Sequence, residues 1–268
     1  MKELTLQEVK EIELEILKTF DTFCKEHNIR YYLAFGTLLG AIRYKKFIPW
    51  DDDVDVLVPR EDYDKLLKLY QDSDKYHLFV FEKDEKYAFP FAKLCNMKTK
   101  LIETFYPDNG IELGVNIDIF PLDAFDNNLE RAKEEVRYIN RKGACLGYSK
   151  TNKIHTNNPI KYFVWSMIVT YCKIRGSAYF IRKIINKSNN PSQKGSAYVG
   201  AKVWCIWGDR CIIPAKAFAD TVYVEFEGQM FPAPAGYDTY LTCLYGDYLP
   251  EPPKDKQKTH HSFVAYRL

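Results

Sequence analysis

The sequence lacks a strong net charge, and this bears first on the class of partner. It contains 38 Lys and Arg against 36 Asp and Glu, so its formal charge at neutral pH is only +2. Proteins dedicated to binding nucleic acid usually carry a marked basic excess on one face. We therefore expect no nucleic-acid partner.

Clustered cysteines and long apolar runs are also missing. The seven cysteines are scattered, and no two have the spacing of a zinc-binding pair, which favours reduced thiols in an intracellular protein. The first residues, MKELTLQEVKEIELEIL, carry charges throughout, unlike a signal peptide, and the longest apolar run, Tyr162–Cys172, is too short to cross a bilayer. These absences predict a cytoplasmic protein and leave peripheral contact with a membrane open.

The most informative stretch that is present covers residues 31–59, YYLAFGTLLGAIRYKKFIPWDDDVDVLVP. Its apolar, aromatic start predicts a strand over Tyr31–Phe35. Gly36 and Thr37 interrupt that strand, and a short helix is expected over Leu38–Arg43. A second strand is expected over Val54–Val58.

The second strand begins with an alternation of acids and valines. Successive side chains on a strand point to opposite faces, so Asp53 and Asp55 are expected on one face, and Val54, Val56 and Val58 on the other. Two carboxylates so close together repel each other unless a cation lies between them. Hard oxygen ligands favour Mg²⁺ or Mn²⁺.

The turn at Gly36 and Thr37 predicts an anion site beside that cation. A helix N-terminus offers unpaired backbone N–H groups to a phosphate. A phosphate at the turn and a metal ion on Asp53 and Asp55 would form a single site.

Other interpretations of the acidic run were weighed. Asp51, Asp53 and Asp55 resemble the start of an EF-hand loop, but that loop needs Gly and Glu where this chain has Val56 and Asp62. A solvated acidic turn would not explain the strand-like valines. Neither alternative accounts for the whole pattern.

Three neighbours of these acids are expected just outside the ligand set. Asp51 and Asp52 would cap the loop or tune the ligands. For Trp50 two roles stay open, packing beneath the acidic loop or stacking on a nucleotide base.

A long motif, GTLLGAIRYKKFIPWDDDVDVLVPREDYDKL, closely resembles the signature of the LicD family, which includes phosphocholine transferases, fukutin and fukutin-related protein. The resemblance implies the polymerase-beta-like nucleotidyltransferase fold, with a Gly-Ser/Thr turn, an Asp-x-Asp strand and a third carboxylate. Asp118, in VNIDIFPLD, matches that third carboxylate. The C-terminal YLTCLYGDYLPEPPKDKQKTHH is similar to the family's closing motif.

The resemblance implies a fold class and a division of the chain. The expected class is α+β: a nucleotidyltransferase-type mixed β-sheet flanked by helices, with a helical middle section and a C-terminal segment that folds back on the active site. Residues 1–125 would form the catalytic core and 201–268 would complete it. Residues 126–200 would be helical and face the acceptor or a membrane, although for 160–185 a plain helical cover on the sheet is the simpler reading.

The implied site residues fall into two groups. The metal-binding and catalytic acids would be Asp53, Asp55 and Asp118. The groups that bind the donor and its phosphates would be Gly36, Thr37, Arg43, Lys93, Lys258, His260 and His261. Lys93 lies in an apolar strand, so it must either contact the substrate or pair with an acid.

The function implied by the resemblance is the Mg²⁺- or Mn²⁺-dependent transfer of a phospho-alcohol to a glycan hydroxyl. The simplest donor is CDP-choline, and CMP would be released. The expected partners are thus a CDP-activated donor and a glycan or glycolipid acceptor. Two alternatives stay open: a nucleotidyltransferase that releases pyrophosphate, and a non-enzymatic module that binds metal or glycan.

The remaining elements follow from hydrophobic periodicity and turn signals. Helices are expected over residues 5–27, 60–70, 127–146, 160–185 and 237–244. Strands are expected over 77–82, 88–96, 101–105, 114–120 and 203–206, with a hairpin over 221–231. Pro121 and Asp123 are expected to end the strand that carries Asp118.

Overall fold

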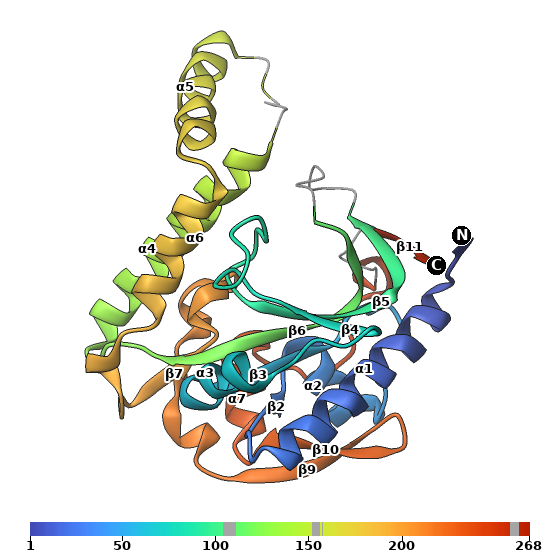
Figure 1. Cartoon of the computed structure of the whole chain (residues 1–268). Helices are drawn as coiled ribbons and strands as arrows, with labels where there is room; N and C mark the ends of the chain where they lie inside the picture. The colour runs from blue at the N-terminus through green and yellow to red at the C-terminus, as the bar shows by residue number, and fades with distance from the viewer. Residues whose placement is uncertain (104–110, 152–155, 157, 258–262) are drawn as a thin grey trace.

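The computed structural model (Figure 1) describes residues 1–103, 111–151, 156, 158–257 and 263–268. The helices are α1 (Leu6–Glu26), α2 (Phe35–Tyr44), α3 (Arg60–Leu69), α4 (Leu129–Lys150), α5 (Pro159–Arg175), α6 (Ser177–Ser188) and α7 (Tyr237–Tyr245). The strands are β1 (Lys2–Glu3), β2 (Tyr32–Leu33), β3 (Asp55–Pro59), β4 (Tyr76–Phe79), β5 (Ala92–Glu103), β6 (Leu113–Ala124), β7 (Tyr198–Gly200), β8 (Ile213–Pro214), β9 (Thr221–Phe226), β10 (Gln229–Pro234) and β11 (Phe263–Arg267).

A curled mixed sheet forms the centre of the fold. Its strands follow the order β1-β11-β5-β6-β3-β2, while β4 also pairs with β5, and β7 pairs with β6 and β8. β3 and β6 run parallel, and β5 lies antiparallel on the other side of β6. The α+β class and the mixed sheet flanked by helices are therefore confirmed.

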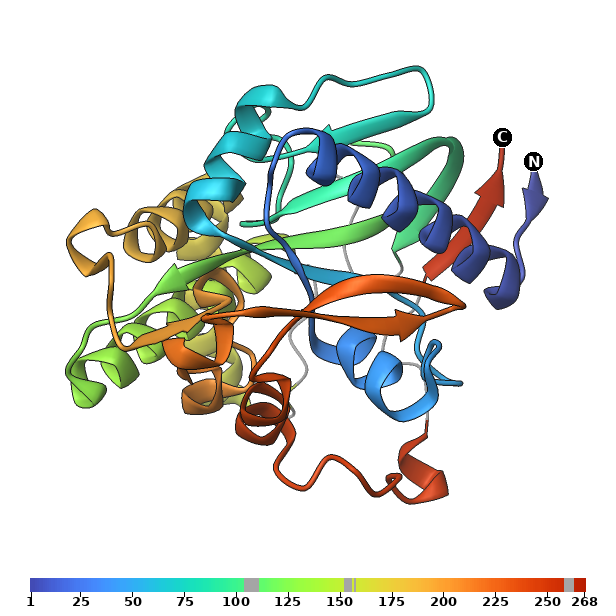
Figure 2. The same ribbon diagram turned by 90° about the horizontal axis from the view of Figure 1, so that it is seen from below.

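Helix α1 covers one face of this sheet (Figure 2). A capping box starts this helix, because the Thr5 hydroxyl accepts a hydrogen bond from the Glu8 N–H while the Glu8 carboxylate accepts one from the Thr5 N–H. Ile16 and Phe20 are completely buried beneath the strands. Burying such side chains contributes roughly 1.5–3 kcal/mol each, so this face supplies much of the core's stability.

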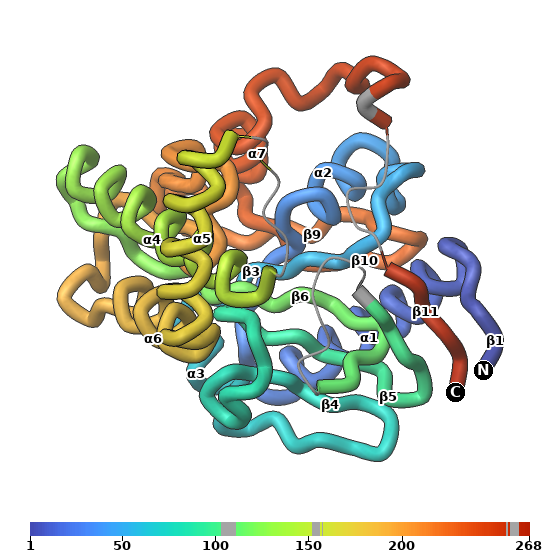
Figure 3. The backbone as a smooth tube through the Cα atoms, turned by 90° about the horizontal axis from the view of Figure 1, so that it is seen from above, coloured from blue at the N-terminus to red at the C-terminus, as the bar shows by residue number. Residues whose placement is uncertain are grey.

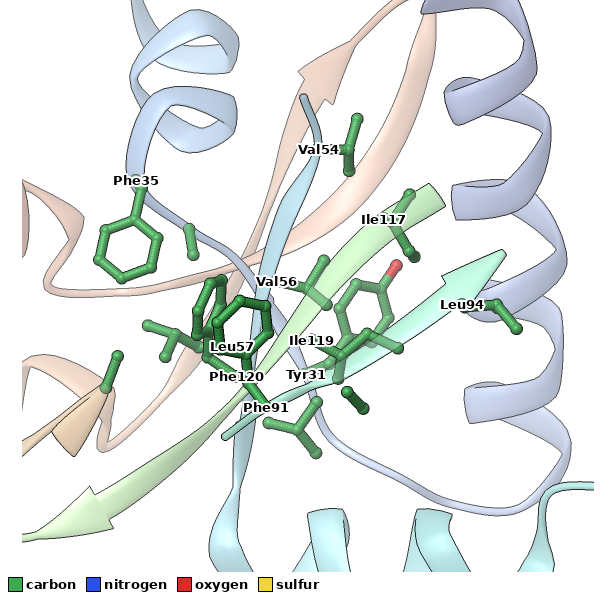
Figure 4. Close-up of a cluster of buried hydrophobic side chains, with 14 of the residues drawn as sticks. Tyr31, Phe35, Val54, Val56, Leu57, Phe91, Leu94, Ile117, Ile119 and Phe120 are labelled. Carbon is green, nitrogen blue, oxygen red and sulfur yellow. The ribbon is translucent and has the colours of Figure 1, made fainter. Parts of the chain in front are cut away.

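The two faces of the sheet are distinguished by the alternation along β3 and β6. In Figure 4, Val56 and Ile117 lie toward α1, while Leu57 and Phe120 lie on the other side with Phe35. Val54 and Val56 are fully buried, which confirms the prediction that the valines enter the core. By the same alternation, Asp55 and Asp118 point away from α1.

The middle of the chain forms a helical arm, defined here as α4, α5 and α6 (Figures 1 and 3). α4 packs against both α5 and α6, and α5 lies at the end of the arm farthest from the sheet. The single helix expected over residues 160–185 is divided in the structure, because Gly176 separates α5 from α6 with φ of 75°. No helix in the described part of the chain combines the length and the apolar character needed to cross a membrane.

The C-terminal segment contacts α2 near the start of the fold. Arg43 on α2 donates hydrogen bonds to the Leu249 and Pro250 carbonyls, and the Tyr44 hydroxyl donates to Glu251 at 2.8 Å. Further on, β11 pairs with β5, and β1 pairs with β11, so the two chain ends lie side by side.

Some predicted boundaries near the site are wrong. Helix α2 begins at Phe35 rather than at residue 38, so Gly36 and Thr37 lie in its first turn. β3 begins at Asp55, so Asp53 precedes the strand instead of sharing a strand face with Asp55.

The predicted ends of other strands also need correction. β6 continues through Pro121 and Asp123 to Ala124. Proline is tolerated there because the pairing of β6 with β5 has already ended at Ile119, so no N–H is needed on that side.

Two further strand predictions differ from the structure. The strand expected over 203–206 is instead a 3₁₀ turn over Lys202–Trp204. The separate strand expected over 101–105 continues β5 as far as Glu103, after a shift in register. Residues 104 and 105 lie outside the described residues.

Asp123 is buried in β6 because an arginine pairs with it. The Arg60 guanidinium, at the start of α3, donates to both Asp123 oxygens at 2.6 and 2.9 Å. Asp123 is 1% exposed. This bidentate pair fixes α3 against the end of β6, and the expectation of a turn acid is wrong.

We predict that Asp123→Ala lowers the free energy of unfolding by about 1.5–3 kcal/mol, because the partly buried Arg60 loses its bidentate partner and keeps only Asp64, at 3.2 Å. Urea unfolding followed by circular dichroism measures the change. The matched control is Glu225→Gln, which removes a surface pair with Lys45 and should leave the midpoint unchanged. Equal effects of the two substitutions would contradict this role for the pair.

Candidate active site

The site begins where the chain turns sharply between β2 and α2. Phe35 has φ of 43°, in the left-handed region that non-glycine residues rarely adopt. Its N–H donates to the Tyr240 hydroxyl at 3.3 Å, and its ring stacks on Trp207 at 4.8 Å between centroids. α7 and the segment before β8 therefore hold this strained residue in place.

Gly36 lies directly against the Asp51 side chain. A Cβ atom at this position would overlap a carboxylate oxygen of Asp51. The Asp51 carboxylate thus lies against the first turn of α2, where the helix dipole favours negative charge. This is the position that the sequence predicted for a phosphate.

Thr37 connects the helix to the acidic strand. Its hydroxyl accepts a hydrogen bond from the Asp55 N–H at 2.8 Å, and both residues are buried. The contact fixes the start of β3 against α2. Thr37 therefore positions Asp55 whatever it does toward a phosphate.

The sheet brings Asp55 and Asp118 together. They are paired in register on the parallel strands β3 and β6, and the Asp118 N–H donates to the Val54 carbonyl at 2.8 Å. The Lys93 ammonium, on β5, donates to Asp118 at 2.5 Å and to Asn116 at 3.1 Å. Lys93 was expected either to contact the substrate or to pair with an acid, and in the structure it pairs with Asp118.

The three acids before β3 gather beside this pair. Asp51, Asp52 and Asp53 each offer a carboxylate oxygen, and these atoms lie within 4.8 Å of one another. Every donor in the cluster is a carboxylate oxygen, the chemistry that suits Mg²⁺ or Mn²⁺. The residues present therefore fit a hard divalent cation.

The electrostatics show how crowded the acids are. Burial, and then the charges of Asp53 and Asp118, raise the pKa of the Asp55 carboxyl well above its usual range. Lys93 opposes this shift in pKa. A cation bound among these acids would oppose the same rise in pKa.

The remaining predicted residues are placed as follows. Arg43 holds the carbonyls of residues 249 and 250 at the rim of α2. Trp50 is half-buried and packs against the core beneath the acidic loop. Lys258, His260 and His261 lie outside the described residues.

The sequence analysis did not identify two charged residues of α1 that lie near the acids. Glu13 is buried, and its Oε2 atom has no hydrogen-bond partner. Burial, and then the charges of Asp53 and Asp52, raise its pKa well above the usual value. Lys10, one turn earlier, donates to the Ile48 and Pro49 carbonyls and so holds the loop that leads to the acids.

A sequence signal for Glu13 does exist. The buried face of α1 includes Ile12, Ile16 and Leu17, and Glu13 falls within that helical spacing. A carboxylate on an apolar face needs a partner or a proton, which marks it as a member of the acidic site.

Aromatic side chains near the acids were also missed. Trp207 and Tyr245, both half-buried, contact each other edge to face with ring centroids 6.0 Å apart. Burial raises the pKa of Tyr245, and the neighbouring Tyr240 and the charges of Asp55, Asp51 and Asp53 contribute to the rise. No spacing in the sequence distinguishes these two rings from the many other aromatics.

We predict a pH-dependent cost from Glu13 in metal-free protein. The pKa in the folded state lies above the unfolded value of 4.5, so folding takes up a proton and stability falls as pH rises above 4.5. Glu13→Gln should remove this slope, which approaches about 1.4 kcal/mol per pH unit. The variant should therefore be more stable than the parent at pH 8 and not at pH 4.5, as measured by urea unfolding in EDTA.

Glu15→Gln is the matched control, because Glu15 lies on the same helix and its side chain is half exposed. It should leave the pH profile unchanged. Parallel profiles for the parent and Glu13→Gln would show that Glu13 carries no such cost.

Comparisons with known proteins agree with this geometry. The family model described as "LicD/FKTN/FKRP, nucleotidyltransferase domain" matches residues 28–134. The lipopolysaccharide cholinephosphotransferase LicD of Haemophilus influenzae is 30% identical over 282 residues, which cover 100% of both chains. Uncharacterised proteins of Rickettsia typhi and Rickettsia prowazekii are 36% identical over 63 residues and 40% identical over 48 residues. These two matches cover 23% and 18% of this chain, and 20% and 18% of the Rickettsia proteins.

The matched region contains β3, β5 and β6, the strands that carry Asp55, Lys93 and Asp118. The similarity to the Haemophilus protein extends through the helical arm and the C-terminal segment as well. Because that similarity covers both chains completely, the chain belongs to the LicD family.

Proposed function

We propose that this protein transfers phosphocholine from CDP-choline to a hydroxyl group of a glycan and releases CMP. The observation that carries the proposal is the register pairing of Asp55 with Asp118, beside the cluster Asp51–Asp53. It occurs in a chain related over its full length to a protein named a lipopolysaccharide cholinephosphotransferase.

The proposed cofactor is Mg²⁺ or Mn²⁺, held by Asp53, Asp55 and Asp118, with Asp51 and Asp52 adjoining. When bound, the cation would neutralise charge on the diphosphate of the donor. Support for this set comes from the all-oxygen donors and from the crowding that raises the pKa of Asp55.

The diphosphate of the donor is proposed to bind at the first turn of α2. The Asp51 carboxylate lies against the backbone at Gly36, so the start of α2 is already next to one negative group. Thr37 keeps Asp55 aligned with this turn. Arg43, Lys93 and the C-terminal Lys258, His260 and His261 complete the proposed set of donor-binding groups.

The chemistry is a displacement at the phosphorus that bears choline. The oxygen of the glycan hydroxyl forms a bond to this phosphorus, and the bond from phosphorus to the CMP oxygen breaks. A site carboxylate takes the hydroxyl proton, and CMP leaves with the electron pair. Catalysis of this kind consists mainly of positioning and charge neutralisation.

Trp207 and Tyr245 are proposed to hold the choline head group. Both rings are half-buried beside the acids, and a quaternary ammonium is attracted to aromatic faces. The stacking of Trp207 on Phe35 connects these two rings to the turn that starts α2. The choline head group would thus bind next to Trp207, and the diphosphate would bind at the neighbouring first turn of α2.

The proposed acceptor is a glycan carried on a glycolipid. Residues 126–200, which include the helical arm, are proposed to face this acceptor, while 1–125 and 201–268 make up the catalytic part. Our proposed setting is the cytoplasm, with peripheral contact between the protein and a membrane.

We predict Mg²⁺-dependent CMP release from CDP-choline in the presence of a glycan acceptor, followed by chromatography. Asp55→Asn and Asp118→Asn should each lower kcat by at least about 100-fold, because each removes a carboxylate that is proposed to bind the divalent cation. Asp220→Asn, at an exposed acid far from the cluster in sequence, is the matched control and should retain full activity. Release of pyrophosphate instead of CMP would point to the nucleotidyltransferase alternative.

We also predict that Trp207→Leu raises KM for CDP-choline by about 3- to 30-fold, because it removes one aromatic face from the quaternary ammonium. The same substitution should change KM for CDP alone much less. Trp165→Leu, on the distant α5, is the control. Equal changes in KM for both nucleotides would exclude a head-group role for Trp207.

A further inference from the structure

Helix α5 presents a continuous apolar stripe to solvent. Its members are Ile160, Phe163, Val164, Met167, Tyr171 and Ile174, with exposed fractions of 75%, 66%, 49%, 60%, 49% and 80%. They recur three or four residues apart, so they share one side of the helix. The opposite side contains the buried Val169 and Cys172, which pack within the arm.

A stripe of this kind differs from ordinary surface hydrophobicity. Single exposed apolar residues are common on soluble proteins, whereas contiguous apolar patches usually mark an interaction surface. The stripe includes large side chains over the whole length of α5, and α5 lies at the end of the arm farthest from the sheet (Figure 1). A large, flat partner could therefore contact the stripe along the whole of α5.

The charge around the stripe indicates which partner. Residues 136–208 contain 13 Lys and Arg and no Asp or Glu, although the whole chain carries a formal charge of only +2. Exposed basic side chains stand at both ends of α5, at Lys161 and Arg175, and continue on α6 at Arg182 and Lys183. Long basic side chains beside an apolar face are typical of helices that lie in the headgroup region of a bilayer.

A second copy of the chain fits this surface less well. A symmetric contact through the stripe would bring two entirely basic regions together, and like charges repel. An anionic lipid surface instead attracts the lysines and arginines while its acyl boundary accepts the apolar side chains.

We propose that α5 docks the protein on an anionic lipid bilayer, with the stripe buried at the boundary between headgroups and acyl chains. This inference rests on the proposed function, because it names the surface on which a glycolipid acceptor is met. The arm and α1 lie at different sides of the sheet (Figure 1). By the alternation along β3 and β6, Asp55 and Asp118 point to the face of the sheet that α1 does not cover. Docking through α5 would thus turn the acidic site toward the lipid surface.

Vesicle flotation tests the inference with the full chain. Vesicles of phosphatidylcholine alone are compared with vesicles that also contain phosphatidylglycerol. The protein should bind the anionic vesicles, and added salt should weaken binding. Met167→Ser/Ile174→Ser should reduce binding by at least roughly tenfold, since two exposed apolar side chains are lost from the stripe.

Two further variants make the test specific. Lys161→Glu/Arg175→Glu should weaken binding to anionic vesicles while the stripe is intact. The matched control, Tyr223→Ser/Met230→Ser, removes side chains that are 56% and 53% exposed on the β9–β10 hairpin, and it should bind as the parent does. Equal losses in the control and stripe variants, or no binding by the parent protein, would overturn the inference.

CMP release from CDP-choline with a water-soluble acceptor is measured on the same samples. A stripe variant that loses vesicle binding and keeps CMP release supports the inference. If the parent protein binds vesicles but releases no CMP, the result supports the docking surface and counts against the proposed function. Self-association that the stripe substitutions abolish, measured by analytical ultracentrifugation, would assign the surface to a second copy and overturn lipid docking.

Discussion

The arrangement of this protein depends on the repulsion among carboxylates at the junction of β3 and β6. Asp51–Asp53, Asp55 and Asp118 approach one another there, and Glu13 adds a buried carboxyl from α1. The Lys93 ammonium contributes a positive charge at the edge of this group, because it contacts Asp118 at 2.5 Å. Buried and partly buried acids this close together are stabilised by protons or by added positive charge, and a divalent cation supplies the latter.

The surrounding structure keeps these acids in place. Phe35 adopts a left-handed backbone conformation under Tyr240 and Trp207, which sets the direction of α2. Thr37 then fixes the backbone of Asp55, so the acids cannot spread apart to relieve their repulsion. In phosphoryl transfer the protein contributes mainly position and charge, and fixed geometry of this kind is how a fold makes that contribution.

Local pattern was enough to predict part of this site. The alternation around Val54 and Val56 indicated a strand with a buried face, and the isoleucines around Asp118 indicated an acid in need of a partner. The contact between Thr37 and Asp55 depends on tertiary packing, and periodicity carries no information about it. Pro121 within β6 was missed for a similar reason, since proline is excluded from a strand only where a neighbour needs its N–H. Glu13 could have been found, because it lies on the apolar face of α1.

Cation binding is the most direct test of the central claim that the acids form a divalent-metal site. Mn²⁺ binding would be followed by electron paramagnetic resonance, with and without CDP-choline, in the parent protein and in Asp53→Asn and Asp55→Asn. The account predicts that the parent binds Mn²⁺, that the nucleotide tightens binding, and that both variants lose it while remaining folded. Equal binding by the parent and the variants would place the cation elsewhere and contradict the account.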